Sequence, residues 1–257
     1  MLNKFIGISV AALLVSTGAA HAGEIYIGGS VGYVDQGDSA NRGQTGAFTT
    51  GNLGDGSTLD VAAGTDYGWD TEFDSGVAFS AEIGKRKQNG LRLALELVNT
   101  SADVDTHKDV TLGGGAIGTL DAAAIAGSPD PLGVTIADVV ADGRGEINQT
   151  GLFANAYYDF PVNIAVKPYV GGGIGVSFVD VDYSPSDIAV IDQDETLFAY
   201  QVKAGASYQL SSPIELFGEV AYRATDDFKG DNVLFPGSLD IENTQTTFSI
   251  GARYTFN

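Results

Sequence analysis

Residues that could perform acid–base chemistry are abundant in this chain, but groups that could activate a nucleophile are scarce. Among 257 residues there are 33 aspartates and glutamates, no cysteine and two histidines, of which only His107 lies beyond the first 22 residues. A serine nucleophile needs a nearby base, usually histidine, and a cysteine nucleophile is excluded by composition. Among so many carboxylates a close pair arises by chance, so a pair alone does not indicate catalysis. We therefore predict that the protein is not an enzyme and that it binds no cofactor or catalytic metal.

A second set of charged residues recurs at alternate positions of apolar segments. In LRLALELV (91–98), leucines alternate with Arg92, Ala94 and Glu96, which is the pattern of a strand with one apolar and one polar face. A charge that points into the core of a soluble sandwich costs several kcal/mol unless it is paired. In a membrane barrel the polar faces line the interior instead. The alternation places these charged residues inside such a barrel: Glu82, Arg92, Glu96, Lys167, Lys203, Glu215, Glu219, Arg223 and Arg253.

The charge balance of this inward set predicts what fills the lumen. It contains five basic and four acidic residues, and a barrel of eight strands is just wide enough for side chains to fill. In YVGGGIGVSF (169–178), alternate glycines share the inward face and leave room for longer neighbours. We expect an ion-pair network that plugs the lumen. The alternative is a narrow porin-like channel that passes ions or small solutes.

The elements that carry these residues are eight segments of alternating polarity, joined by links of two alternating lengths. Tight turns fall at 88–90, 161–163 and 211–213, and long links span 35–75, 101–145, 179–194 and 226–243. Short turns at one end and long loops at the other are typical of an outer-membrane barrel, whose short turns face the periplasm. The sequence predicts an all-β fold, an eight-stranded antiparallel up-and-down transmembrane barrel with strands near 24–34, 76–87, 91–100, 146–158, 164–178, 195–209, 214–225 and 244–256.

The N-terminal 22 residues have the features of an export signal. An early lysine, an apolar run and the ending Ala20-His21-Ala22 predict a secretory signal peptide at 1–22. The remaining residues, 23–257, are expected to form the single barrel domain. Its predicted location is the bacterial outer membrane, in contact with outer-membrane lipid and lipopolysaccharide.

Most acidic residues lie in the four long links, and the formal net charge is −20. Such a surface repels nucleic acid, which we exclude as a partner. Long external loops on a rigid scaffold are where binding functions reside. We expect acidic extracellular loops that contact an external cell-surface or host ligand.

Several segments together resemble one family. The chain is similar to the outer-membrane β-barrel surface-antigen and opacity-type porin family of Gram-negative bacteria in the segments 76–97, 153–179, 198–223 and 251–256. The resemblance implies insertion by the barrel-assembly machinery, which reads a C-terminal strand signal that Ser249, Gly251, Tyr254 and Phe256 match. It also implies a role in adhesion, surface antigen display or envelope integrity, or a weak porin activity.

Overall fold

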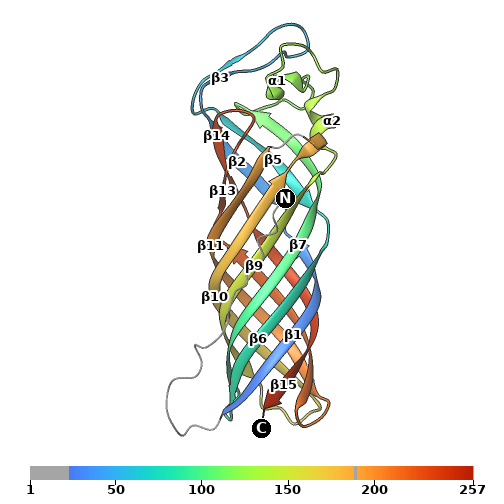
Figure 1. Ribbon diagram of the computed structural model, residues 1–257, viewed down its shortest axis with the longest axis vertical. Helices are drawn as coiled ribbons and strands as arrows, with labels where there is room; N and C mark the ends of the chain where they lie inside the picture. The colour runs from blue at the N-terminus through green and yellow to red at the C-terminus, as the bar shows by residue number, and fades with distance from the viewer. Residues whose placement is uncertain (1–22, 188–189, 257) are drawn as a thin grey trace, which may run out of the picture.

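The computed structural model describes residues 23–187 and 190–256. Eight long antiparallel strands, tilted relative to the barrel axis, form a closed cylinder (Figure 1). The first and last strands pair with each other, which closes the ring and confirms the predicted fold. The predicted signal peptide, 1–22, lies outside the described residues. The barrel strands are β1 (Gly23–Gln36), β6 (Gly76–Lys87), β7 (Leu91–Leu112), β9 (Gly145–Asp159), β10 (Val166–Tyr183), β11 (Ile191–Gln209), β12 (Ile214–Thr225) and β15 (Thr244–Phe256).

The outer wall of the barrel is apolar because the alternate positions of each strand point outward. Ile174 is 61% exposed and Ile250 is 70% exposed, although both are large apolar residues. Similar side chains cover neighbouring strands, including Val31, Phe79, Leu93 and Val202. This continuous band is the lipid-facing surface that a transmembrane barrel requires.

The strands continue beyond the lipid-facing band, into segments that the sequence pattern assigned to loops. β7 was expected to end near residue 100 but runs to Leu112, and β10 runs to Tyr183. Further strands extend the wall in the order β13-β14-β2-β5-β7, with bounds β2 (Ser39–Thr45), β5 (Asp66–Phe73), β13 (Phe228–Asp231) and β14 (Gly237–Ile241). The reason is visible in DYGWDTEF (66–73), where acidic residues alternate with Tyr67, Trp69 and Thr71, which point inward and are buried. The outward face of these strands meets water, so it carries acids in place of apolar residues.

We call the described parts of 35–75, 101–145, 179–194 and 226–243 the cap. At the top of the cap lie short elements: β3 (Phe48–Thr49), β4 (Asp60–Val61), β8 (Gly115–Ala116), α1 (Ala123–Ala126), α2 (Ile136–Val140) and the 3₁₀ turn η1 (Pro185–Asp187). α2 begins with a capping box between Thr135 and Asp138. None of the helices in the described chain is long and apolar enough to cross a membrane.

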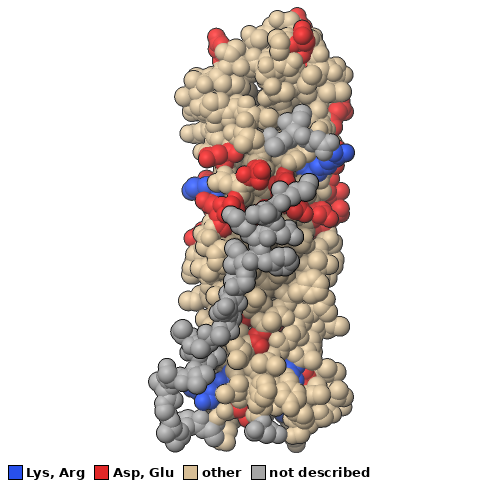
Figure 2. Space-filling model, viewed as in Figure 1, with Lys and Arg blue, Asp and Glu red and all other residues tan. Residues whose placement is uncertain are grey.

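Acidic side chains mark the level at which the cap begins. Figure 2 shows carboxylates gathered at and above mid-height on the visible face, with few charges on the wall below. One row of four carboxylates crosses four adjacent strands, because the register pairs Asp103 with Glu146, Glu146 with Asp182, and Asp182 with Asp192. Like charges opposite one another are unfavourable unless water solvates them. The row therefore lies above the lipid.

The interior changes character along the barrel axis. From the end with the short turns upward, it holds a layer of ion pairs, then a layer of amide side chains, and then an apolar core inside the cap. The cap core comprises Tyr67, Trp69, Ala102, Val104, Ile147, Val179, Val181, Tyr183, Ile191, Leu197, Phe228, Leu239 and Ile241.

Candidate functional site

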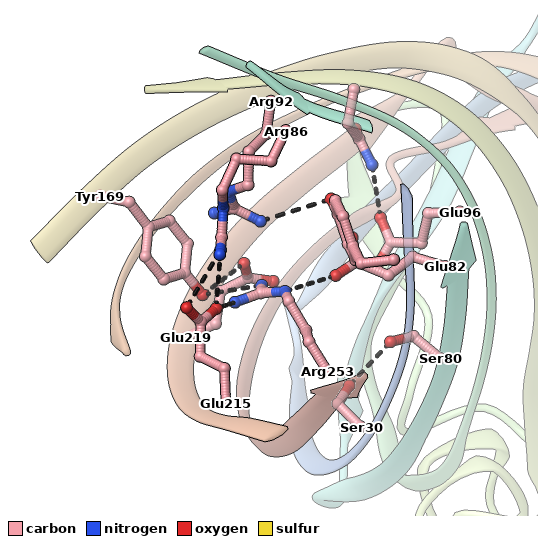
Figure 3. A network of polar contacts seen from close by, with 12 residues as sticks. Ser30, Ser80, Glu82, Arg86, Arg92, Glu96, Tyr169, Glu215, Glu219 and Arg253 are labelled. Carbon is pink, nitrogen blue, oxygen red and sulfur yellow. Dashed lines mark hydrogen bonds and ion pairs between the residues drawn. The ribbon is translucent and has the colours of Figure 1, made fainter. Parts of the chain in front are cut away.

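One group of ion pairs in the lumen is built on a row of residues across four strands. The register places Glu82 opposite Gly28, Gly28 opposite Arg253, and Arg253 opposite Glu215. Arg253 Nε lies 2.7 Å from Glu82 Oε1, and Nη1 lies 3.2 Å from Glu215 Oε1 (Figure 3). The two side chains meet over Gly28, where a Cβ would approach Glu82 Cγ to 3.0 Å and Arg253 Cγ to 3.1 Å. A glycine at this position therefore makes room for the ion pair.

A second cation, Lys203, lies between two carboxylates. Its Nζ is 2.7 Å from Glu96 Oε1 and 2.9 Å from Glu219 Oε1, and the side chains of all three are at most 7% exposed. Glu96 also accepts hydrogen bonds of 2.8 Å from the amides of Asn155 and Gln201. Each carboxylate oxygen of Glu96 therefore has a partner, which offsets the cost of burying its charge.

Amide side chains continue the network toward the cap. Arg223 donates to Gln201 Oε1 and to Gln245 Oε1, each at 3.0 Å. Gln245 in turn donates to Gln36 at 3.0 Å. Above them, Gln149 donates to Asn243 Oδ1 at 2.7 Å. These bonds link the ion-pair layer to the base of the apolar cap core.

Aromatic rings fill the space between the charged groups. The Arg92 guanidinium lies 4.4 Å from the ring centroid of Tyr157 and 4.7 Å from that of Tyr169, and Arg253 lies 3.8 Å from that of Phe217. The ring of Tyr157 occupies the space above Gly171, where a Cβ would lie 2.2 Å from its Cδ1. The alternate glycines of β10 thus leave room for long neighbours.

Eight of the nine predicted inward charges lie in this network, whereas Lys167 does not. It has the inward parity of β10 but is exposed, because it lies near the short-turn end of the strand. Arg86 and Asp159, which were not among the predicted inward charges, also join the network. Arg86 Nη2 lies 2.9 Å from Glu215 Oε1, and Arg92 Nε lies 2.8 Å from Asp159 Oδ1. Their parity could have identified both, since Arg86 shares the face of Glu82. The lumen charges become five basic and five acidic, namely Arg86, Arg92, Lys203, Arg223 and Arg253 with Glu82, Glu96, Asp159, Glu215 and Glu219.

His107, the histidine considered as a catalytic base, lies in the cap on β7. Its Nδ1 is 2.8 Å from Thr71 Oγ1, and Thr71 is fully buried. Burial lowers the pKa of His107 to about 4. Because the hydroxyl of Thr71 is fully buried, the pair offers no accessible nucleophile beside the histidine base. The described residues contain no group of three or more His, Asp or Glu side chains placed to hold a metal ion.

The C-terminal strand presents the aromatic residues of the predicted assembly signal on its outer face. The rings of Tyr254 and Phe256 lie 5.2 Å apart, and both side chains are nearly half exposed. Ser249 and Gly251 are on the opposite, inward-facing parity of β15. The signal residues are thus divided between the two faces of one strand.

Comparison with known proteins agrees with this architecture. The family model described as surface antigen matches residues 53–253. The chain belongs to the surface antigen family. Major surface antigen 4 of Anaplasma marginale is 28% identical over 198 residues, which cover 73% of this chain and 62% of that relative. The outer membrane protein OprG of Pseudomonas aeruginosa superposes with a TM-score of 0.55 at 17% identity, covering 92% of this chain and 97% of that one.

These comparisons confirm the predicted family, the barrel fold and the location. The surface antigen family member lies in the bacterial outer membrane. The match to OprG supports the fold alone, because the identity is low. The match to Major surface antigen 4 leaves more than a third of that relative uncovered, so its properties are not transferred.

Proposed function

We propose that this surface antigen family member is a sealed outer-membrane barrel that displays an acidic cap outside the cell, as an adhesion, antigenic or envelope-stabilising protein. The sealed lumen is supported by a chain of contacts along the interior. It runs from Asp159 through Arg92, Tyr169 and Glu219 to Lys203. From Lys203 it continues through Glu96, Gln201, Arg223, Gln245 and Gln36 to Asn243. We expect that ions would have to displace these side chains in order to pass. The lumen is therefore a scaffold rather than a path.

The energetics of the network favour this role. Removing one partner of a buried ion pair costs about 3–5 kcal/mol, because the other charge remains buried without compensation. In the lumen the basic and acidic groups are equal in number, and most of their side chains are less than a tenth exposed. A balanced, buried network resists the rearrangement that conduction would require.

The cap supplies the surface for partners. Its outer face carries the row that begins at Asp103 and ends at Asp192, and external acidic surfaces select partners through charge. The partners we propose are outer-membrane lipid and lipopolysaccharide around the wall, the barrel-assembly machinery at the last strand, and an external cell-surface or host ligand at the cap. We propose no catalytic activity and no cofactor.

Single-channel conductance in a planar bilayer tests the sealed lumen. The mature protein, residues 23–257, is refolded, and heat-modifiable gel migration establishes that the barrel has formed. We expect a folded and silent wild-type barrel. Stable openings in the wild type would refute the proposal and favour the porin-like channel.

Two variants sharpen this test. Lys203→Ala removes the cation between Glu96 and Glu219, and we expect it to destabilise the barrel and to produce openings. Lys85→Ala is the matched control, because Lys85 is exposed on the outer face of β6. Altered ion selectivity in Lys203→Ala, with stability unchanged, would instead identify a working pore.

A further inference from the structure

The cap encloses a cavity that the proposed surface role does not use. Its volume is about 420 Å³, and its lining comes from β3, β4, β5, the tip of β7 and the segment around α1. These elements lie in the upper part of the molecule in Figure 1. This volume is within the range of small-molecule sites, which are mostly apolar with a few polar groups. The lining fits that description, since it includes Phe48, Tyr67, Trp69, Leu112, Ile125 and Phe235.

Aromatic contacts hold the walls of this cavity in place. Phe48 stacks on Phe235 at a centroid distance of 4.8 Å, and Tyr67 meets Phe235 edge-on at 5.1 Å. The ring of Trp69 lies 6.2 Å from that of Tyr67. Interlocked rings form a preformed wall, and their faces and edges suit an apolar or aromatic guest.

The roof of the cavity is fixed by backbone hydrogen bonds. Gly51 N donates to Ala124 O at 3.0 Å, and Asn52 N donates to Ser128 O at 2.9 Å, which joins the β3–β4 hairpin to the α1 segment. The Asp121 carboxylate accepts bonds of 2.9 Å from the backbone N–H groups of Ala123, Leu132 and Gly133. These bonds hold the β3–β4 hairpin and the α1 segment against each other. Access is from the external side, because the cap core and the amide layer lie below.

Three residues of the lining, Tyr67, His107 and Tyr183, each have a buried side-chain polar atom that lacks a hydrogen-bond partner in the described chain. His107 lines the cavity and is 3% exposed, and its Nδ1 is engaged with Thr71. Its Nε2 is buried without a hydrogen-bond partner among residues 23–187 and 190–256. Buried polar atoms in folded proteins almost always have a partner, and leaving one unsatisfied is costly. A guest with a single polar group could provide the missing partner.

We propose that the cap cavity binds a small apolar molecule, aromatic or short aliphatic, that carries one hydrogen-bonding head group directed at His107. The apolar walls select the body of the molecule, and the free imidazole nitrogen selects its head. This site is separate from the lumen network, so it does not depend on whether the lumen conducts.

The position of Trp69 makes the proposal measurable. It is the only tryptophan in the chain and it lines the cavity, so quenching of its fluorescence reports occupancy. The probes are 4-bromophenol, whose bromine quenches tryptophan and whose hydroxyl can bond to His107, and bromobenzene, which lacks the hydroxyl. N-acetyltryptophanamide in the same detergent gives the unbound reference. We expect saturable quenching of the refolded protein by 4-bromophenol, with at least about tenfold tighter binding than bromobenzene.

Variants of the lining distinguish how much the polar head group and the apolar body of the guest each contribute to binding. His107→Phe should weaken 4-bromophenol about tenfold and leave bromobenzene within about twofold. Val110→Phe and Leu120→Phe, from two different segments of the lining, should each fill the cavity and remove saturable quenching. Asp105→Asn is the control, because Asp105 is exposed on the outer face of β7.

Three results would overturn the proposal. The first is quenching of the wild type that rises linearly, as for the reference compound. The second is equal affinity for the two probes. The third is saturable quenching that survives in a filling variant that migrates as a folded barrel. If one of the two filling variants fails to fold, the other still tests whether the cavity is the binding site. The comparison of 4-bromophenol with bromobenzene on the wild type tests the proposal without any variant.

Discussion

Replacing Lys203 with methionine removes the cation between Glu96 and Glu219 while keeping an unbranched side chain of similar length. Two carboxylates are then left close together in the lumen, each stripped of an ammonium at less than 3 Å. Glu96 keeps its bonds from Asn155 and Gln201, and Glu219 keeps the bond of 3.0 Å from the Tyr169 hydroxyl. Breaking a buried pair costs about 3–5 kcal/mol, and because these donors remain we expect a loss at the lower end, about 3 kcal/mol.

A second substitution tests whether the loss comes from uncompensated charge. Glu96→Gln preserves the shape of the side chain and removes one negative charge, so the double variant should recover about 1–3 kcal/mol of the loss. The assay is urea unfolding of the refolded barrel in phospholipid vesicles, followed by the fraction that migrates as folded without heating. Lys85→Met, on the outer face, is the control and should change stability by less than about 0.5 kcal/mol. A loss below about 1 kcal/mol for Lys203→Met, or a double variant as unstable as the sum of the two single variants, would refute the reasoning.

Other predictions concern the wall, the cap and assembly. Gly171→Val should prevent refolding or lower stability by several kcal/mol, on the order of other overpacked cores, because a Cβ there would collide with the Tyr157 ring; urea unfolding measures this. Burial lowers the pKa of His107 to about 4, below its ordinary value near 6.5, so protonation favours the unfolded cap. Through His107, cap stability should fall by up to about 3 kcal/mol as the pH drops from 6.5 to 4, which Trp69 fluorescence would follow, and His107→Phe should reduce this dependence. Phe256→Ser should reduce barrel insertion in cells while refolding in detergent stays normal, as comparison of outer-membrane fractions with purified protein would show.

The periodicity of the sequence predicts the eight membrane strands because lipid on one side and a polar lumen on the other impose a strict alternation. The same rule fails above the membrane. In 66–73 the outward residues are acidic, and an acid-rich segment resembles a loop even though Tyr67 and Trp69 alternate with those acids. The alternation of inward and outward positions also predicted that Lys167 lies inside, because alternation does not indicate where along a strand the lumen ends.

The cavity of the cap has no local signature in the sequence. Its lining comes from segments as distant as Phe48, Ile125 and Phe235, which only the folded chain brings together. Pairing in the network is similar: alternation indicates that Glu82 and Arg253 face inward, but their contact depends on the register of β1 between them. The local sequence determines which face of a strand a side chain occupies, whereas its ion-pair partner depends on the tertiary structure.

The row that joins Glu82, Gly28 and Arg253 crosses the seam where the two ends of the barrel meet. Glu82 is on β6, and its ion-pair partner in the described chain is Arg253 on β15, the last strand to be synthesised. Until β15 docks on β1, the Glu82 carboxylate lacks its ion pair with Arg253, and a charge that faces the lumen without such a partner is unfavourable. The Glu82–Arg253 ion pair therefore stabilises the closed barrel relative to a sheet in which β15 has not yet paired with β1. This difference favours cooperative closure of the ring.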